Sequence, residues 1–450
     1  MSEAKCFIHL SDIHFGQEKG GEVIFHDDVK EQVIRQVRSL AAARRTAGAS
    51  PLCGVLVTGD IAYSGTKAQY EIAAAWLDRL TAAAGCGSTD VQVVPGNHDI
   101  DRNRISTSAG LLFDKIMAGG QQALDLCLAS EMDREVLYDR FTDYRPFAYG
   151  YGCKLDNEGG RAGEKRFDLG HGRTLSVSGL NSALLCKKKD EPGELILGAR
   201  QMVFGDEDGV AHVVLSHHPL HWFSDAGTAR KYLHNRTAVL LSGHEHQPSW
   251  NVENIDDEPR FLALAAGALI PPHATEEYNY AFNIIEFSLS ADAHGLNVAV
   301  HPYCWDRDRL RFSQDDNMFE GAQLSQAFEV RCPCFSEAEH VAPAPLAQAN
   351  ELQSDQAPAE SAELIEAEEE EGMVAMDPRF PGLRQRFFQR LGAVQRLRVL
   401  DDLGAIPKGV STVPNMTFER IALERIQSNT QKVDRLAAAI DEQIRAAEAS

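Results

Sequence analysis

The chain has 450 residues, of which 44% are hydrophobic and 24% charged, as in soluble globular proteins with two or three domains. Its net charge of −22 argues against general binding along a nucleic-acid duplex. No signal peptide is recognisable, and the longest apolar run, residues 261–270, is about half as long as a membrane span. Nine scattered cysteines suit a reducing compartment, so a cytoplasmic protein without a membrane partner is expected.

The first region, residues 1–331, alternates short β-branched runs with helical patterns. Helices are predicted at residues 25–47 and 69–84, and a helical insertion is predicted at about residues 105–144. The β-branched runs predict strands at residues 5–11, 54–58, 91–94, 174–178, 210–216, 238–242, 260–265, 281–287 and 296–301. The β-α-β-α-β order at the start predicts an α/β domain with a sheet covered on both faces.

The second region, residues 332–378, contains no Lys or Arg and twelve acidic residues. It has too few large apolar groups to offset the entropy cost of ordering the chain, so an acidic disordered linker is predicted. Because the composition breaks here, a protein that ends near Ala338 is expected to fold and to keep its activity.

The third region, residues 379–450, has the pattern of a helical interaction module. Amphipathic pieces at residues 383–391 and 394–403 precede Gly404, which stands where a glycine often ends a helix. A long last helix capped by Asn415 or Thr417 is expected to reach about residue 447. Its apolar stripe suits either the inside of a bundle or contact with another chain; the stripe consists of Ile426, Val433, Leu436, Ile440 and Ile444.

Side chains able to bind metal follow five of the predicted strands, each just past the strand's carboxyl end. Open α/β sheets place their ligand sites at such ends, so the five segments can converge. In chain order the residues are Asp12, His14, Asp60, Asn97, His98, His217, His218, His244 and His246.

Two carboxylates, one amide oxygen and four imidazoles are too many ligands for one divalent ion but suit two. Asp60, the lone acid after its strand, is the natural bridge between the ions. The mixture of oxygen and nitrogen donors favours manganese, with iron or zinc as alternatives. Each fragment alone has an ordinary structural explanation, such as a turn or a helix cap, but all five in this order favour a metal site.

These segments resemble the calcineurin-like metallophosphoesterase superfamily over residues 5–305. The resemblance implies a four-layer α/β sandwich with a binuclear metal centre. By the same resemblance, Asp12, His14 and His246 hold the first metal, Asp60 bridges, and His98 acts as the acid or polarises the phosphate. The ligands that it implies for the second metal are Asn97, His217 and His244. The motifs that carry the resemblance are Ser11-Asp12-Ile13-His14, Thr58-Gly59-Asp60, Gly96-Asn97-His98-Asp99, His217-His218-Pro219 and Gly243-His244-Glu245-His246.

The stretch after Gly59-Asp60 lacks the Asp-Arg pair of the Ser/Thr protein phosphatases. It looks more like the bacterial cyclic-nucleotide-type phosphodiesterases, while the double-strand-break repair nucleases share the Ser-Asp-x-His and Gly-Asn-His-Asp motifs. The insertion begins in the loop that carries His98, so it is expected to roof or flank the site. Arg102, Arg104 and His218 are candidate contacts to the substrate, with a solvated helix start as the alternative for the arginines.

The sequence therefore predicts an enzyme that hydrolyses a phosphodiester by metal-bound hydroxide, with His98 as the acid. Two alternatives stay open: a metal-dependent nuclease effector recruited through its C-terminal module, and a non-enzymatic metal-binding scaffold. The module itself resembles the small helical effector-associated adaptor domains of bacterial conflict systems. That resemblance implies recruitment by like-with-like association, so a second copy of the chain or an adaptor partner is expected.

Overall fold

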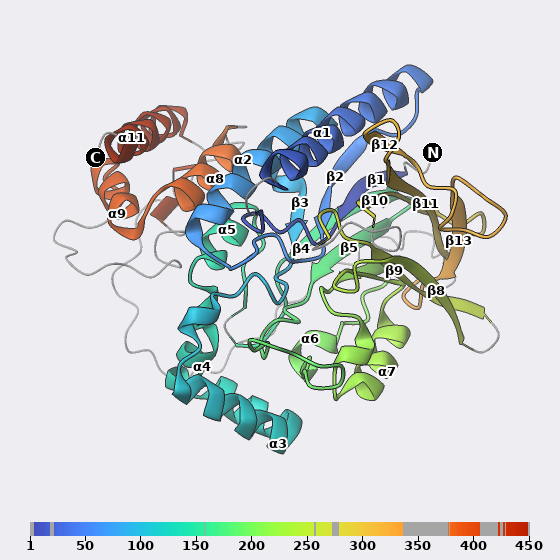
Figure 1. Cartoon of the computed structure of the whole chain (residues 1–450), viewed down its shortest axis with the longest axis horizontal. Helices are drawn as coiled ribbons and strands as arrows, with labels where there is room; N and C mark the ends of the chain where they lie inside the picture. The colour runs from blue at the N-terminus through green and yellow to red at the C-terminus, as the bar shows by residue number, and fades with distance from the viewer. Residues whose placement is uncertain are drawn as a thin grey trace, which may run out of the picture.

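The computed structural model describes residues 4–18, 22–156, 158–255, 258–271, 279–335, 377, 379–405, 422–423, 426–427 and 429–448. Two β-sheets pack face to face, and helices cover the outer side of each, which gives the four layers seen in Figure 1. One continuous hydrophobic core runs through these layers. The α/β class and the four-layer arrangement are confirmed.

The first sheet has three parallel strands at one side and antiparallel strands at the other. Its order is β12-β11-β10-β1-β2-β3, and β13 also pairs with β11. The strands are β1 (Lys5–Leu10), β2 (Leu52–Val57), β3 (Val91–Val93), β10 (Ala281–Leu289), β11 (Gly295–Asp306), β12 (Arg311–Gln314) and β13 (Gln326–Arg331).

The second sheet has a parallel centre, β5-β6-β7-β9, with an antiparallel strand at each edge. Its strands are β4 (Glu164–Gly170), β5 (Arg173–Gly179), β6 (Val210–Leu215), β7 (Val239–Ser242), β8 (Pro248–Ile255) and β9 (Glu258–Ala266). The sequence did not predict β4, β8, β12 and β13. Each of these strands pairs with a single neighbour and so lies at a sheet edge, where solvent exposure breaks up the apolar runs that revealed the central strands.

Helices α1 (Glu22–Ala47) and α2 (Lys67–Ala84) cover the first sheet (Figure 1). α2 buries one face against the core and ends at Gly85, whose φ of 81° suits glycine. α6 (Ala199–Met202) and α7 (Ala226–Arg236) cover the second sheet, where the ring of His234 packs 4.1 Å from that of Phe261. None of the described helices combines the length and the apolar character that crossing a membrane requires.

The region of the predicted insertion holds α3 (Thr107–Ala129) and α4 (Glu131–Tyr138), which project from the body of the molecule in Figure 1. The chain then returns to the body as α5 (Tyr144–Gly150), most of whose residues are buried. The insertion thus joins the loop that carries His98 to a helix beneath α2.

The C-terminal module contains α8 (Phe380–Arg390), α9 (Ala393–Asp402) and α11 (Thr430–Glu448). Gly404 follows α9 with a φ of 61°, as its position predicted. The predicted start of the last helix is wrong: Asn429 accepts a hydrogen bond from the backbone of Lys432 and so caps a helix that begins at Thr430, after a turn. The two caps proposed from the sequence, Asn415 and Thr417, lie outside the described residues.

The apolar stripe of α11 is used inside the module. Val433, Leu436 and Ile440 are completely buried against α8 and α9. These three residues of the stripe therefore complete a small helical bundle, while Ile444 at its end is partly buried.

Candidate metal centre

The loops after β1, β2, β3, β6 and β7 meet at one edge between the two sheets. Backbone hydrogen bonds join them: the amide of Asp12 donates to the carbonyl of Gly59, and that of His14 donates to the carbonyl of Asp60. The amide of Gly243 donates to the carbonyl of His217 and links the loops of the second sheet. The metal-binding segments predicted from the sequence do converge.

Five of the seven candidate ligands have a left-handed backbone, with φ between 52° and 72°; they are Asp12, His14, Asp60, His244 and His246. This conformation is uncommon for residues other than glycine and clusters at functional sites. Two glycines allow the close approach of the loops. A Cβ atom on Gly96 would lie 2.1 Å from Oδ1 of Asp60, and one on Gly243 would lie 1.8 Å from Oγ of Ser11. The local backbone is thus shaped around the side chains of the site.

The first group of donors contains Asp12, His14 and His246, whose ligand atoms lie within 4.8 Å of one another. Nδ1 of His14 donates to the carbonyl of Ile270 at 3.1 Å, which turns Nε2 toward the site. Nε2 of His246 lies 3.4 Å from Oδ1 of Asp12. That carboxylate oxygen is buried and has no hydrogen-bond partner among the described residues, so it is an acceptor open to a cation.

The second group contains Asn97, His217 and His244. Oδ1 of Asn97 lies 3.0 Å from Nε2 of His217 and 3.0 Å from Nδ1 of His244. Nδ1 of His217 donates to the carbonyl of Thr58 at 2.8 Å, so its Nε2 carries the lone pair in the neutral ring. A lone pair thus faces the oxygen of Asn97, and a cation between these atoms relieves their repulsion.

Asp60 connects the two groups. Its Oδ2 lies 3.2 Å from Nε2 of His14 and 3.4 Å from Nε2 of His217. Its Oδ1 accepts the backbone N–H of His98 at 2.8 Å, which leaves Oδ2 to face both groups. Ligands about 2.0–2.2 Å from a metal are separated by about 3 Å from each other, which agrees with these spacings. The donor set therefore fits two divalent ions with Asp60 between them.

The charges of the site support this interpretation. Burial opposes ionisation of Asp60, but His217, His98 and His14 together hold its pKa well below the ordinary value. Burial alone would lower the pKa of His217, yet Asp60 and Asp12 raise it to about 9. Without a metal, a proton on His217 thus takes the place that a cation fills when the site is loaded.

His98 stands beside the donors. Its ring lies 5.0 Å from that of His14 and stacks on Tyr63 at 5.0 Å. Nδ1 donates to the carbonyl of Tyr63 at 2.8 Å, so Nε2 is the nitrogen available for proton transfer. Burial lowers its pKa, Asp60 raises it, and nearby cations that include Arg102 lower it again, with a net decrease.

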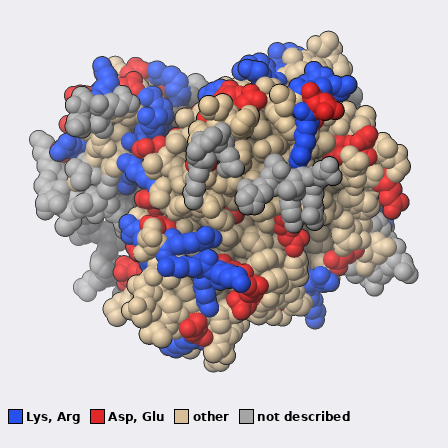
Figure 2. Space-filling model, in the orientation of Figure 1, with Lys and Arg blue, Asp and Glu red and all other residues tan. Residues whose placement is uncertain are grey.

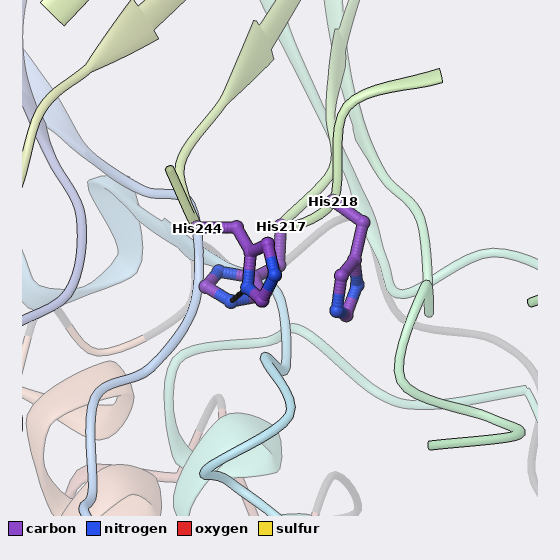
Figure 3. Close-up of side chains that lie close together, drawn as sticks. All are labelled: His217, His218 and His244. Carbon is purple, nitrogen blue, oxygen red and sulfur yellow. Dashed lines mark hydrogen bonds between the residues drawn. The ribbon is translucent and has the colours of Figure 1, made fainter. Parts of the chain in front are cut away.

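His218 lies behind the second group. Figure 3 shows its ring beside the paired rings of His217 and His244, and the ring centres of His218 and His244 are 4.5 Å apart. The side chain is completely buried; Nδ1 meets Oγ of Ser182 at 2.9 Å and Nε2 faces Sγ of Cys186 at 3.8 Å. These partners support His244 by packing and leave His218 poorly placed for a substrate.

The two candidate arginines differ in their surroundings. Nη2 of Arg102 donates to the carbonyl of Asn97 at 3.2 Å, and its buried Nε has no hydrogen-bond partner in the described part of the chain. Arg104 instead forms ion pairs with Asp101 and Asp139, at 3.5 Å and 3.0 Å. Arg102 therefore lies next to the candidate ligand Asn97, whereas the ion pairs of Arg104 stabilise the start of the insertion.

The sequence interpretation gave no role to Asp99. Its buried carboxylate accepts the backbone N–H groups of Ile61, Ala62 and Gly96 at 2.9–3.1 Å, and so joins the loops that carry Asp60 and Asn97. Asp99 is the last residue of the Gly-Asn-His-Asp motif, and that position was a signal for a role in the site. Its hydrogen-bond partners are backbone N–H groups, which no sequence pattern marks. The carbonyls that orient His14 and His217, from Ile270 and Thr58, were missed for the same reason.

Comparisons with known proteins identify the family of the chain. Residues 7–248, just over half of the chain, match the calcineurin-like phosphoesterase family, and residues 379–442 match the GTPase-associated adaptor domain. An uncharacterized metallophosphoesterase-like protein of Bacillus subtilis strain 168, YydB, is 25% identical over 325 residues, which are 69% of this chain and 61% of that protein. The match thus spans about three fifths of the relative's length.

Two of the solved structures that match the chain share little sequence with it. A single mutant of Vps29 from Entamoeba histolytica is 10% identical, with a TM-score of 0.28, and the match covers 72% of this chain and 99% of that one. The NAD nucleotidase of Haemophilus influenzae is 12% identical, with a TM-score of 0.30, and the match covers 69% and 53%.

Proposed function

Since this chain belongs to the calcineurin-like phosphoesterase family, we propose that it hydrolyses a phosphodiester with the help of two divalent metal ions. Membership of the family supports the activity of a metal-dependent hydrolase of phosphoric esters. That the substrate is a diester, and that two ions take part, is our proposal. The observation that carries it is the arrangement around Asp60, whose Oδ2 faces one histidine of each donor group.

When bound, two divalent ions supply an activated water and neutralise phosphate oxygens. Asp12, His14 and His246 would hold one ion, and Asn97, His217 and His244 the other, with Asp60 shared. Manganese is the ion that we propose, because the set mixes carboxylate and amide oxygens with imidazoles, and iron and zinc are the alternatives.

His98 would transfer the proton in this reaction. Tyr63 fixes the ring through Nδ1, so a proton carried on Nε2 can pass to the leaving oxygen of the ester. Arg102, which lies against the backbone of Asn97, would bind a phosphate oxygen through its guanidinium group. These two side chains give the site an acid and a positive charge beyond the metals.

The charge distribution favours a small diester over a long nucleic acid. On the face shown in Figure 2, basic side chains occur in small groups with acidic side chains near them, and the net charge is −22. Long polyanions bind best to extended basic surfaces. The nuclease and the scaffold remain the competing hypotheses.

The C-terminal module supports a role in recruitment, since residues 379–442 match an adaptor domain. Its apolar stripe is buried within the bundle, so we propose that a second copy or an adaptor partner would meet the polar outer surface of the module. The nine cysteines, all within the described residues, form no disulfide, which supports our proposal of a cytoplasmic location.

One experiment separates these hypotheses. The full-length protein is loaded with Mn²⁺ and incubated with a chromogenic diester, a monoester, cyclic nucleotides, plasmid DNA, single-stranded DNA and RNA. Release of product from the small diesters alone supports the proposal. Degradation of plasmid or RNA supports the nuclease, and metal binding without any hydrolysis supports the scaffold.

A further inference from the structure

The C-terminal module is docked on the catalytic domain. Figure 1 places α8 beside α2 and α5, and three contacts define the seam between them. The ring of Phe388 lies 4.4 Å from that of Tyr149, in an edge-to-face arrangement. Nε2 of Gln389 donates to the carbonyl of Phe147 at 3.3 Å, and Nε2 of Gln385 donates to Oδ1 of Asp78 at 2.6 Å.

The seam is closely packed around Tyr149 and leaves a cavity of about 200 Å³ lined in part by Tyr70, Phe147 and Phe388. Tyr149 is only 7% exposed and belongs to the hydrophobic cluster of the module, although it stands on α5 of the catalytic domain. A Cβ atom on Gly150 would lie 3.0 Å from the side chain of Gln389, so the lack of a side chain there lets α8 approach. The module therefore packs directly against the catalytic domain in this structure.

From the seam, direct contacts lead to the metal-binding loops. The ring of Phe147 stacks on that of Tyr70 at 4.9 Å with an angle of 29° between the planes. The hydroxyl of Tyr70 lies 2.9 Å from the carbonyl and 3.1 Å from Oδ1 of Asp99. Tyr70 and Asp99 are both completely or almost completely buried.

Asp99 links Tyr70 to the metal-binding loops through hydrogen bonds. Its carboxylate holds the amides of Ile61 and Ala62, which directly follow Asp60, and the amide of Gly96, which directly precedes Asn97. A displacement of the Asp99 carboxylate would therefore shift Asp60, which lies between the two donor groups, and Asn97, which belongs to the second group.

We propose that the C-terminal module positions the metal-binding loops through Phe147, Tyr70 and Asp99. Tyr70 is then a positioning residue for Asp60 and Asn97, and α8 holds Tyr70 in place by supporting Phe147. The proposal rests on the metal centre described under the proposed function. It gives the module a second task besides recruitment, because a partner that pulls α8 away would weaken metal binding.

The test measures the affinity of full-length protein for Mn²⁺ by isothermal titration calorimetry. Tyr70→Phe removes the hydroxyl and keeps the ring, and loss of such a supporting hydrogen bond is expected to lower the affinity roughly tenfold. The double variant Tyr149→Ala with Gln389→Ala opens the seam from both sides, and it is expected to lower the affinity at least about threefold. Arg435→Ala is the matched control, because this exposed arginine donates to a carbonyl of the module itself, that of Asp402.

Circular dichroism and thermal unfolding are recorded for each variant. A purely structural role of Tyr70 would lower the melting temperature and leave the Mn²⁺ affinity of the folded protein unchanged, and that result overturns the proposal. Wild-type affinity in the seam variant, or an equal loss in Arg435→Ala, overturns it as well. If the wild type binds Mn²⁺ but hydrolyses no ester, the proposed function fails, while the comparison of affinities still decides this inference.

Discussion

Oδ2 of Asp60 lies 3.4 Å from Nε2 of His217, and this contact joins a loop of the first sheet to a loop of the second. Asp60 follows β2 and His217 follows β6, so neither sheet contains the site alone. The packing of the two sheets therefore sets the distance between the two donor groups, and a metal pair bound there would stabilise that packing in return.

The bridging position of Asp60 predicts the effect of Asp60→Asn. An amide keeps the size of the carboxylate but loses its charge, so the variant should bind at least one metal fewer and lose most of its activity. Elemental analysis of the purified protein measures the metal. Asp168→Asn, on the edge strand β4, serves as the control. Two full equivalents of metal in Asp60→Asn would show that this carboxylate is not the bridge.

His98→Ala should leave the metal content near normal, because none of the assigned metal positions depends on this ring. General acid catalysis is typically worth about 10²–10⁴-fold, so turnover of a diester with an alkoxide leaving group should fall by that order. The loss should be much smaller for a nitrophenolate, which leaves without a proton. Equal losses for both substrates, measured side by side, would point to polarisation of the phosphate.

Metal binding should strengthen as the pH rises. The pKa of His217 in the metal-free site is raised to about 9, so below that pH the ring holds a proton that a metal must displace. The apparent Mn²⁺ affinity should therefore increase by about tenfold per pH unit and level off near pH 9. Calorimetric titrations in buffers of different ionisation enthalpy count the protons released. Binding without proton release at pH 7 would contradict the assignment of His217.

The two arginines of the insertion should behave differently. Arg102→Ala removes a charge beside Asn97 and should lower kcat/KM roughly tenfold or more, mainly by raising KM. Arg104→Ala breaks ion pairs with Asp101 and Asp139 and should leave kcat/KM close to that of the wild type. Steady-state kinetics on one diester compares them, and an unchanged KM in Arg102→Ala would exclude its phosphate contact.

The buried stripe of the module predicts the outcome of Val433→Asp. A charge at this completely buried position costs several kcal/mol of folding free energy, so the module should unfold. The molar mass of the whole protein in static light scattering should stay the same. Hydrogen exchange of α8 and α11 measures the unfolding. Gln431→Asp introduces the same charge at an exposed position of the same helix and should have little effect. Dissociation of an oligomer by Val433→Asp alone would instead place this stripe in a contact between chains.

The expectation that a protein ending near Ala338 keeps its full activity now has a competing prediction. Composition separates the module from the catalytic domain, but composition does not report contacts between them. Removal of α8 would expose Tyr149 and the face of α5 around it. If the module positions the loops, the shortened protein should bind Mn²⁺ more weakly than the full chain.

The sequence by itself determined the central strands and the residues that follow them. Both are local properties: an apolar run of β-branched residues makes a buried strand, and Asp12, Asp60, Asn97, His217 and His244 stand directly after such runs. The motif order also sufficed to indicate the fold family, which the comparison over residues 7–248 confirmed. The assignment of each ligand to one of two metals stays a prediction.

Only the tertiary structure decided which groups support the site and where the module lies. Asp99, Thr58 and Ile270 act through backbone amides and carbonyls, which every residue has, so no pattern marks them. Strands β4, β8, β12 and β13 were missed because their exposed faces carry polar residues. The contact of Phe388 with Tyr149 depends on how two separately folded surfaces fit together, and that fit is a property of shape in three dimensions that periodicity along the chain does not encode.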